Sequence, residues 1–289
     1  MARTWLLGVA VAVLAGCGSG DSAKAADPLA VSAGRTGEFK LAGELKQGGW
    51  VRGAAPSGAR ALSFNGVAVP LSPDGQFMVA FDRDAGPSAT LTAMLGNGRT
   101  VTRQLSISPR AWKIEHIPLG PRPGAKPSEA FRIRREAELA RIREARAVWS
   151  GSEGWRQNFI WPAVGRLSGR FGSQRIYNGV PGSFHSGMDI APGASGTPFV
   201  APADGVVILA AQSPFSLEGK LLMIDHGMGL NSAFLHCSAV LVSEGERVRQ
   251  GQVIGRIGMT GRATGPHLHW SIKWRDARLD PLLFTGAMR

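Results

Sequence analysis

Five residues in the C-terminal half of the chain have the types and spacing of a metal site. In chain order they are His185, Asp189, His236, His267 and His269. Imidazole nitrogen and carboxylate oxygen suit Zn²⁺, and a site with three protein ligands leaves one coordination position open for water. That is the arrangement of catalytic rather than structural zinc. The pattern therefore predicts a catalytic Zn²⁺ site within this half of the chain.

The segments that carry these histidines have the alternation of β-strands. In the run HLHWSIKW, His267 and His269 point to one face and the apolar residues between and after them point to the other. The same alternation in the run NSAFLH places Phe234 and His236 on a common face. We therefore expect strands that aim the histidines at one site and bury an apolar face behind it.

Three motifs follow one another in the chain: H-x-x-x-D at His185 and Asp189, the single His236, and H-x-H at His267 and His269. In this order they resemble the lysostaphin-type (LytM-like) zinc endopeptidases of bacterial cell walls. The resemblance runs from about Phe159 to Pro281. The flanking runs that share it are SFHSGMDIA, APADG, IDHG, TG and GPHLHW. One H-x-x-x-D motif alone would be a weak signal, whereas three ordered motifs with these flanks make a strong one.

The resemblance implies a role for each of the five residues. His185, Asp189 and His269 would hold Zn²⁺, and His236 and His267 would be catalytic residues beside the open position. In that arrangement the metal polarises the scissile carbonyl and lowers the pKa of its water. The two unliganded imidazoles position or deprotonate the water and stabilise the oxyanion.

Four residues near the motifs need separate interpretation. Phe234 stands where the family often has tyrosine, so any hydrogen bond from that phenol is missing. Tyr177, the only tyrosine, precedes His185 and could contribute at the cleft. His226 follows an apolar run in a predicted hairpin turn, which favours a structural role. Cys237 neighbours His236 on a strand and should face away from it, so we expect a small buried apolar residue rather than a nucleophile.

Short apolar runs punctuated by glycine dominate the chain after Gly151. They predict an all-β catalytic domain, and the family resemblance implies an open groove on it. Similar turns occur in biotinyl and lipoyl carrier domains. A carrier needs an acceptor lysine on an exposed hairpin, and these turns offer none in a convincing context.

The N-terminus has the pattern of an export signal. A positive charge precedes an apolar stretch over 5–14, and the run LAGC ends at Cys17. This run resembles the lipobox of bacterial lipoproteins, which implies lipidation of Cys17 and an anchor in a membrane facing the periplasm. Gly18 after the cysteine favours the outer membrane. The alternative is an ordinary signal peptide with cleavage elsewhere.

The charge of the chain gives a further indication of its partners. Lys and Arg number 33 against 21 Asp and Glu, a net charge of +12. No zinc-finger spacing, helix-turn-helix or RNA-binding aromatic motif accompanies it, so we expect no nucleic acid as partner. An anionic cell-wall polymer or lipopolysaccharide surface fits an exported protein better.

A second β unit precedes the catalytic half. Its hairpin signals are Asn65-Gly66, the run GNGR over 96–99, and Asp74-Gly75. About seven short strands suggest an immunoglobulin-like sandwich. The unit contains no histidine or cysteine, so positioning or binding is more plausible than chemistry.

After four prolines, Ser128 can cap a helix. Its Phe131, Leu139, Ile142 and Trp149 fall near one stripe, with charged residues on the other faces. Two interpretations of this helix stay open, a solvated connector and a regulatory arm that packs over the groove or contacts a partner.

The predicted fold class is mainly β, with an N-terminal immunoglobulin-like β-sandwich, a connecting α-helix and a C-terminal lysostaphin-type β-sheet metallopeptidase domain. The expected segments are a lipoprotein signal peptide over 1–16, a tether over 17–35, the immunoglobulin-like domain over 36–110, a Pro-rich linker over 111–127, the connecting helix over 128–149 and the zinc metallopeptidase domain over 150–289.

These observations together predict a lipid-anchored zinc endopeptidase that hydrolyses peptide cross-links or stem peptides of peptidoglycan. Its expected partners are the peptidoglycan peptide, the membrane through the lipid anchor, and a cell-wall or division regulator protein. The alternative is a catalytically silent scaffold of the same fold that activates a cell-wall amidase. Silent members typically lose metal ligands, whereas this chain retains all three expected ligands and both auxiliary histidines.

Overall fold

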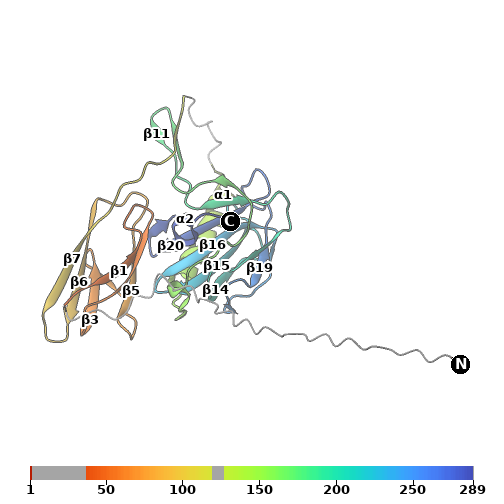
Figure 1. Ribbon diagram of the computed structural model, residues 1–289. Coiled ribbons are helices and arrows are strands. Elements are labelled where there is room, and N and C mark those ends of the chain that lie inside the picture. The colour runs from red at the N-terminus through yellow and green to blue at the C-terminus, as the bar shows by residue number, and fades with distance from the viewer. Residues whose placement is uncertain (2–36, 119–126, 289) are drawn as a thin grey trace. The chain divides into compact units, whose positions relative to one another are not determined.

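The structure is a computed structural model that describes residues 1, 37–118 and 127–288. The predicted signal peptide beyond Met1, the lipidation site Cys17, the tether and the middle of the Pro-rich linker lie outside these residues. Within the described part of the chain, no helix is long and apolar enough to cross a membrane. The fold is mainly β, as the sequence predicts (Figure 1).

The N-terminal β unit consists of two sheets, with the strand orders β1-β2-β5 and β4-β3-β6-β7. The strands are β1 (Lys40–Gly43), β2 (Trp50–Ala54), β3 (Ala59–Phe64), β4 (Val67–Val69), β5 (Gln76–Ala80), β6 (Ser88–Leu95) and β7 (Thr100–Ser106). Apolar residues of both sheets, including Leu62, Phe77 and Leu91, are buried. This arrangement matches the predicted sandwich.

Two of the three hairpin signals in this unit are confirmed. Asn65-Gly66 joins β3 to β4, and the turn over 96–99 joins β6 to β7. The interpretation of Asp74-Gly75 as a hairpin is wrong, because β5 pairs with β2 rather than with β4. The turn carries the chain from one sheet to the other, and its own residues do not distinguish such a crossing from a hairpin.

The segment expected to be a linker contains a strand, β8 (Ile114–Ile117). It pairs in parallel with β10 (Gln174–Tyr177), sixty residues further along the chain, with Ile114 opposite Gln174. Parallel pairing between segments so far apart leaves no local signal in the sequence. The proline-rich composition of this segment therefore predicted a linker, and the strand was missed. The strand β11 (Val180–Pro181) pairs with the other edge of β10.

The connecting helix, α1 (Glu129–Ala147), begins as predicted, because the Ser128 hydroxyl accepts the Phe131 N–H at 3.1 Å. The helix is docked on the C-terminal domain and is not a connector solvated on all sides. Ala145 is buried in a core cluster against which Ile142 packs. The expected apolar stripe is wrong in part, because Phe131 and Leu139 each remain 37% exposed.

The C-terminal half is built on one large sheet. In the described residues it has the order β18-β14-β15-β16-β20-β12-β9, with β21 paired to β20. The strands are β9 (Arg166–Gly169), β12 (Met188–Ala191), β14 (Gly205–Ala210), β15 (Lys220–Gly227), β16 (Leu230–Cys237), β18 (Arg247–Val248), β20 (Leu268–Trp274) and β21 (Ala277–Leu279). A smaller sheet comprises β13 (Pro198–Val200), β17 (Ala239–Val240) and β19 (Val253–Arg256), and the short helices are η1 (Gly154–Arg156) and α2 (Leu282–Thr285).

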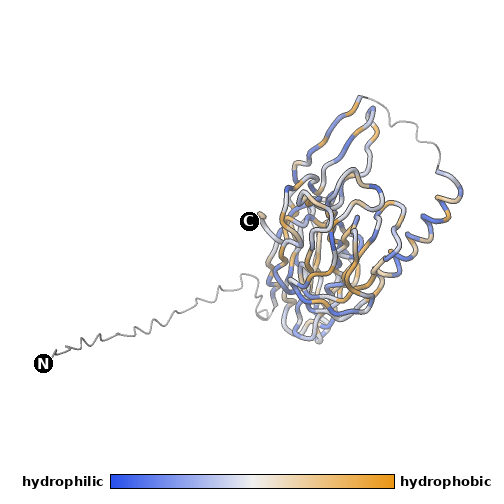
Figure 2. The backbone as a smooth tube through the Cα atoms, turned by 90° about the vertical axis from the view of Figure 1, so that its right-hand side faces the viewer, coloured by the Kyte–Doolittle hydropathy of each residue, from blue (hydrophilic) through white to orange (hydrophobic). Residues whose placement is uncertain are grey.

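The two faces of the large sheet have different roles. On neighbouring strands, Phe234 lies opposite Trp270 and Leu235 lies opposite His269, and such paired residues share a face. Phe234 and Trp270 are fully buried, and Phe234 stacks on Phe199 of β13 with ring centroids 5.3 Å apart. One face therefore packs on the smaller sheet. The other face carries His269 and, through Ala233 and Leu235, packs in the apolar cluster that includes Ala145 of α1. Apolar segments gather in the interior of the described chain (Figure 2).

Candidate metal centre

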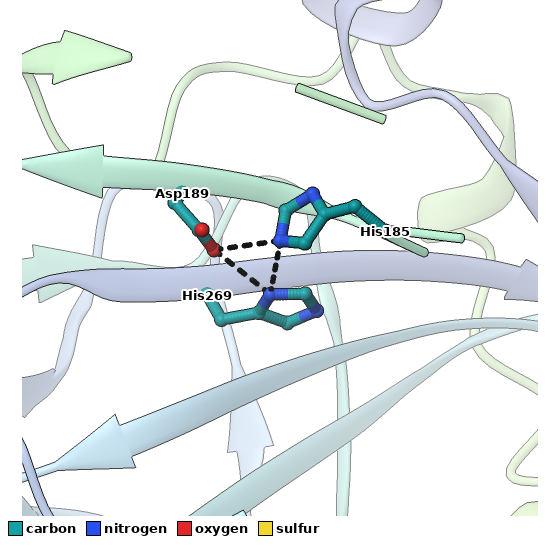
Figure 3. Close-up of side chains that lie close together, drawn as sticks. All are labelled: His185, Asp189 and His269. Atoms are coloured by element: carbon teal, nitrogen blue, oxygen red, sulfur yellow. Dashed lines mark hydrogen bonds and ion pairs between the residues drawn. The ribbon is translucent and has the colours of Figure 1, made fainter. Parts of the chain in front are cut away.

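Three of the predicted residues converge on one point (Figure 3). Asp189 of β12 and His269 of β20 are paired across the two strands, and His185 lies in the loop that enters β12. Asp189 Oδ1 is 3.0 Å from His185 Nε2 and 2.9 Å from His269 Nδ1, and the two nitrogens are 3.1 Å apart. The alternation predicted for β20 is what turns His269 toward this group.

The geometry of this group fits Zn²⁺. Tetrahedral zinc holds nitrogen and oxygen ligands at about 2.0–2.1 Å, which places neighbouring ligand atoms about 3.3 Å apart. The three atoms here are slightly closer, so small outward rotations of the side chains would admit the ion. Two imidazoles and one carboxylate also form the donor set that zinc prefers.

Backbone carbonyls fix which nitrogen each ring presents. A carbonyl oxygen only accepts, so a ring nitrogen beside it carries the proton and the other nitrogen keeps its lone pair. His185 Nδ1 lies 3.2 Å from the Arg170 carbonyl oxygen. His236 Nδ1 is 2.8 Å from that of Thr260, and His267 Nδ1 is 2.8 Å from that of Gly265. All three rings therefore hold Nε2 available for chemistry.

His236 and His267 lie beside the three converging residues. His267 Nε2 is 3.8 Å from Asp189 Oδ1. The ring centroid of His236 is 4.8 Å from that of His267 and 6.4 Å from that of His269. The structure thus brings all five predicted residues into one site, with three at ligand distances and two adjacent.

The prediction that Phe234 and His236 share a face is wrong. The pairing of β15 with β16 shifts register between Lys220 and Leu222, and His236 has a positive φ of 64°. This bulge reverses the alternation, so Phe234 points into the core and His236 points to the site. A backbone in the left-handed region is uncommon for a residue other than glycine and leaves no signal in a strand-like sequence.

The site shifts the protonation of its members. Burial opposes ionisation of Asp189, but hydrogen bonds from His185 and His269 outweigh it and hold the pKa of the carboxyl below its usual range. Burial also opposes the charge on His185, yet its hydrogen bond with Asp189 raises its pKa. Burial dominates at His236 and His269 and lowers the pKa of each.

Two glycines that we did not single out leave room for the ligands. A Cβ on Gly169 would lie 2.2 Å from Asp189 Oδ2, and one on Gly187 would lie 2.7 Å from His269 Nε2. Any side chain at either position would collide with a ligand. Gly187 lies inside the HSGMD run and could have been found there, whereas Gly169 carries no local signal.

The remaining residues near the motifs have structural positions. His226 is fully buried at the end of β15, with Nδ1 2.8 Å from the Asp204 carbonyl oxygen and Nε2 2.9 Å from the Ser232 hydroxyl. The hairpin turn lies just beyond it, at 228–229. Cys237 is fully buried, and burial raises its thiol pKa to about 12, so it is not a nucleophile. Tyr177 lies in β10 beside β8.

One side chain of the N-terminal sandwich supports the candidate metal centre. Arg83, which is 6% exposed, donates from Nε and Nη2 to the Gly172 carbonyl oxygen at 3.1 and 3.0 Å. The Gly172 N–H donates to the His185 carbonyl oxygen at 2.8 Å. Arg83 therefore reaches the segment that holds His185, and no sequence pattern indicated this.

Comparison with known proteins gives a family and several relatives. The model of peptidase family M23 matches residues 183–281. The peptidoglycan DD-endopeptidase ShyA of Vibrio cholerae is 42% identical over 88 residues, which are 30% of this chain and 20% of that protein. The DD-carboxypeptidase/endopeptidase Mpg of Neisseria meningitidis is 40% identical over 98 residues, 34% of this chain and 22% of that protein.

A relative with a different description matches over a longer stretch. The lipoprotein NlpD/LppB homolog of Pseudomonas aeruginosa is 37% identical over 131 residues, 45% of this chain and 39% of that protein. This chain spans less than half the length of each of these three relatives.

The chain is similar to a solved crystal structure over most of its length. It is a Pseudomonas aeruginosa protein described as a peptidase M23, with 30% sequence identity and a TM-score of 0.63. The match covers 85% of this chain and 96% of that one. The likeness therefore extends beyond the segment that contains the metal centre.

Proposed function

This chain belongs to peptidase family M23, and from that premise we propose that it is a zinc-dependent endopeptidase that hydrolyses peptide cross-links or stem peptides of peptidoglycan. The proposal is supported most directly by the convergence of His185, Asp189 and His269 within 2.9–3.1 Å of one another. The names of two relatives, a peptidoglycan DD-endopeptidase and a DD-carboxypeptidase/endopeptidase, support the substrate class.

The five residues divide the chemistry between them. Zinc held by His185, Asp189 and His269 would polarise the scissile carbonyl and acidify a water molecule. The Nε2 lone pairs of His236 and His267 can accept a proton from that water. Once protonated, the same imidazoles can donate hydrogen bonds to the oxyanion or a proton to the leaving nitrogen. A nucleophilic side chain is not required.

A second candidate function is a catalytically silent scaffold that activates a cell-wall amidase. The likeness to a protein named as a lipoprotein rather than as a peptidase favours it. It ranks second because a silent member would be expected to lack metal ligands. All three are present here, and the two auxiliary histidines lie beside them, each with Nδ1 against a backbone carbonyl oxygen.

We place the protein on the periplasmic side of a membrane, anchored through lipidated Cys17. The lipobox-like LAGC run and the lipoprotein name of one relative support this placement. Gly18 after the cysteine favours the outer membrane. There the cationic chain would face the anionic cell wall, and a division or cell-wall regulator protein could contact it.

Digestion of purified sacculi tests the proposed function. The Cys17→Ala protein, released from its anchor, should convert cross-linked muropeptides into new peptide-cleaved products when loaded with zinc. A chelator should abolish the conversion, and added zinc should restore it. The matched control is the same protein carrying Asp189→Ala. If zinc-loaded protein leaves the muropeptides unchanged but stimulates a purified cell-wall amidase, the scaffold function is correct instead.

A further inference from the structure

The residues 214–219, here called the bracing loop, contact the backbone of His236 directly and its ring indirectly, through Thr260. The backbone carbonyl of Glu218 accepts the His236 N–H at 2.8 Å. At the next position, a Cβ on Gly219 would lie 2.3 Å from the carbonyl oxygen of Thr260. That carbonyl oxygen also accepts Nδ1–H of the His236 ring. The bracing loop therefore supplies the acceptor for the His236 backbone N–H and packs against the acceptor for the His236 ring.

His236 needs support from outside its own strand. Its φ of 64° lies in the left-handed region, where the Cβ of a residue other than glycine comes too close to the following carbonyl oxygen. The ladder between β15 and β16 is irregular where His236 lies, and the His236 N–H goes to Glu218 of the loop. Such a strained conformation persists only where the surroundings hold it.

The N-terminal half of α1 holds the bracing loop. Arg135 donates Nη1 and Nη2 to the two carboxylate oxygens of Glu218 at 2.6 and 2.7 Å, with both side chains mostly buried. Glu138 Oε1 accepts the N–H and the hydroxyl of Ser216 at 2.7 and 2.8 Å. Arg134 Nη2 donates to the Pro214 carbonyl oxygen at 2.7 Å. Bidentate and charge-assisted hydrogen bonds of this kind are strong and orient their partners.

The other half of α1 is attached by apolar packing. Ile142 and Ala145 pack in an apolar cluster with residues of β14, β15 and β16 and with Phe215 of the bracing loop. Apolar packing of this kind keeps the helix docked when a polar contact at its other end is removed. The polar contacts with the bracing loop therefore add orientation rather than the whole attachment of the helix.

We propose that α1 is a positioning element for His236, acting through Arg135 and Glu138 on the bracing loop. The inference rests on the proposed function only for the role given to His236. It assigns a purpose to a helix that the sequence left open between connector and arm. Arg135 and Glu138 are positioning residues, because they act through Glu218, Ser216 and the backbone and touch no reacting atom.

The test compares Arg135→Ala and Glu138→Gln with the control Arg132→Ala. Arg132 lies on the same helix, is exposed, and pairs within the helix with Glu129. For each variant, zinc content, kcat and KM on a defined cross-linked muropeptide, and amide hydrogen exchange are measured. We expect zinc to stay at wild-type content and KM to change little. The kcat should fall on the order of 10-fold in both positioning variants, because small misplacement of a catalytic group lowers the rate.

Conservative and charge-reversed variants separate positioning from general loss of structure. Arg135→Lys should recover only part of kcat, because lysine cannot reproduce the bidentate contact. Arg135→Glu combined with Glu218→Arg should exceed either single variant in kcat. Hydrogen exchange should accelerate at 214–219 and 235–237 in Arg135→Ala, while β20 stays protected as in the wild type.

Three outcomes would overturn the proposal. The first is a wild-type kcat in Arg135→Ala, and the second is unchanged amide hydrogen exchange at 235–237 in that variant. The third is a loss of kcat accompanied by loss of zinc and by faster hydrogen exchange throughout β20. If the wild-type protein cleaves no muropeptide, the proposed function fails by itself. The exchange measurement then still decides whether α1 holds His236, so the two failures are distinguishable.

Discussion

At the residue scale, the two histidines of the H-x-H motif share a face but present different atoms. His269 places Nδ1 at 2.9 Å from Asp189 Oδ1, whereas the nearest contact of His267 to that oxygen is Nε2 at 3.8 Å. Nδ1–H of His267 donates a hydrogen bond to the Gly265 carbonyl oxygen. This difference supports the proposed roles of His269 as a metal ligand and His267 as an auxiliary residue, and substitution tests both.

Substitution of a proposed ligand should remove both metal and activity. His269→Ala and Asp189→Ala each leave two ligands, which is too few to hold zinc in a site with an open position. We expect zinc content to fall from about one per chain to near zero, together with loss of muropeptide cleavage. Metal analysis after dialysis measures the first and product analysis the second. Full zinc occupancy with wild-type turnover in Asp189→Ala would show that the ligand assignment is wrong.

Substitution of a proposed auxiliary residue should lower activity without removing zinc. His236→Ala and His267→Ala should keep zinc while kcat falls on the order of 10²-fold or more, the usual effect of losing acid–base or oxyanion help. Their KM should change much less, because these interactions strengthen mainly in the transition state. Zinc loss as large as in His269→Ala would contradict this division of labour.

At the scale of elements, β20 joins the site to a buried polar network on its opposite face. Trp270 Nε1–H donates to the Ser232 hydroxyl at 3.2 Å, and that hydroxyl is 2.9 Å from His226 Nε2. The Ser232 hydroxyl thus donates to His226, whose Nδ1–H donates to the Asp204 carbonyl. These four residues all have hydrogen-bond partners only while His226 is neutral, because Nε2 must accept from Ser232 while Nδ1–H donates to Asp204. Through Trp270, the network holds β20 on the face opposite to the one that carries His269.

This network predicts a pH dependence of stability. Burial lowers the pKa of His226 to about 4, whereas an unfolded histidine titrates near 6.5. Below pH 6.5 the unfolded chain therefore binds a proton that the folded chain does not, so stability falls as pH falls toward 4. The loss should reach about 2 kcal/mol between pH 7 and pH 5.

The variant His226→Gln isolates this effect. Glutamine keeps one donor for Asp204 and one acceptor for Ser232 but does not titrate. Urea unfolding of metal-free protein at pH 7 and pH 5 should show a smaller loss in the variant than in the wild type. Equal losses in the two proteins would assign the pH dependence to other groups.

At the scale of the whole molecule, the N-terminal sandwich contributes to the metal centre although it contains no histidine or cysteine. Its Arg83 donates to the Gly172 carbonyl, and Gly172 in turn donates to the His185 carbonyl. The Arg83 guanidinium also lies over the rings of Trp112 and Phe184, at 5.2 and 4.7 Å. The sandwich therefore supports the segment that carries the proposed ligand His185 and is not a separate module.

Removal of this contact should affect both stability and metal binding. Arg83→Ala leaves the buried Gly172 carbonyl without these hydrogen bonds, which should lower the free energy of unfolding by about 1–3 kcal/mol. It should also weaken zinc binding, because the segment that carries His185 becomes less constrained. Urea unfolding and competition with a zinc chelator measure the two effects. The exposed Arg103 of β7 is the control, and an Arg103→Ala effect equal to that of Arg83→Ala would contradict the assignment.

The proposed attachment of the whole chain to a membrane depends on one residue, Cys17. Cys17→Ala should abolish lipidation and move the protein from the membrane fraction to the soluble fraction. Fractionation with detection of a C-terminal tag measures this. Membrane association that still requires detergent in the variant would show that the anchor is not the one proposed.

The sequence alone determined the chemistry of the site and much of the local structure. The types and order of the H-x-x-x-D, middle histidine and H-x-H motifs specified the five residues that converge. Period-two alternation set the faces of β20, and Asn65-Gly66 and Ser128 marked a hairpin and a helix start that the structure confirms. These signals are local, because each depends on bonded geometry or on contacts within a few residues.

Only the tertiary structure decided the features that depend on pairing between distant segments. The bulge that turns His236 to the site arises from the register of β15 against β16. The crossing at Asp74-Gly75, the parallel pairing of β8, and the contacts of Arg83 and Arg135 likewise join segments far apart in the chain. Register and docking follow from the burial and hydrogen bonding of the whole fold, so no single segment carries their signal.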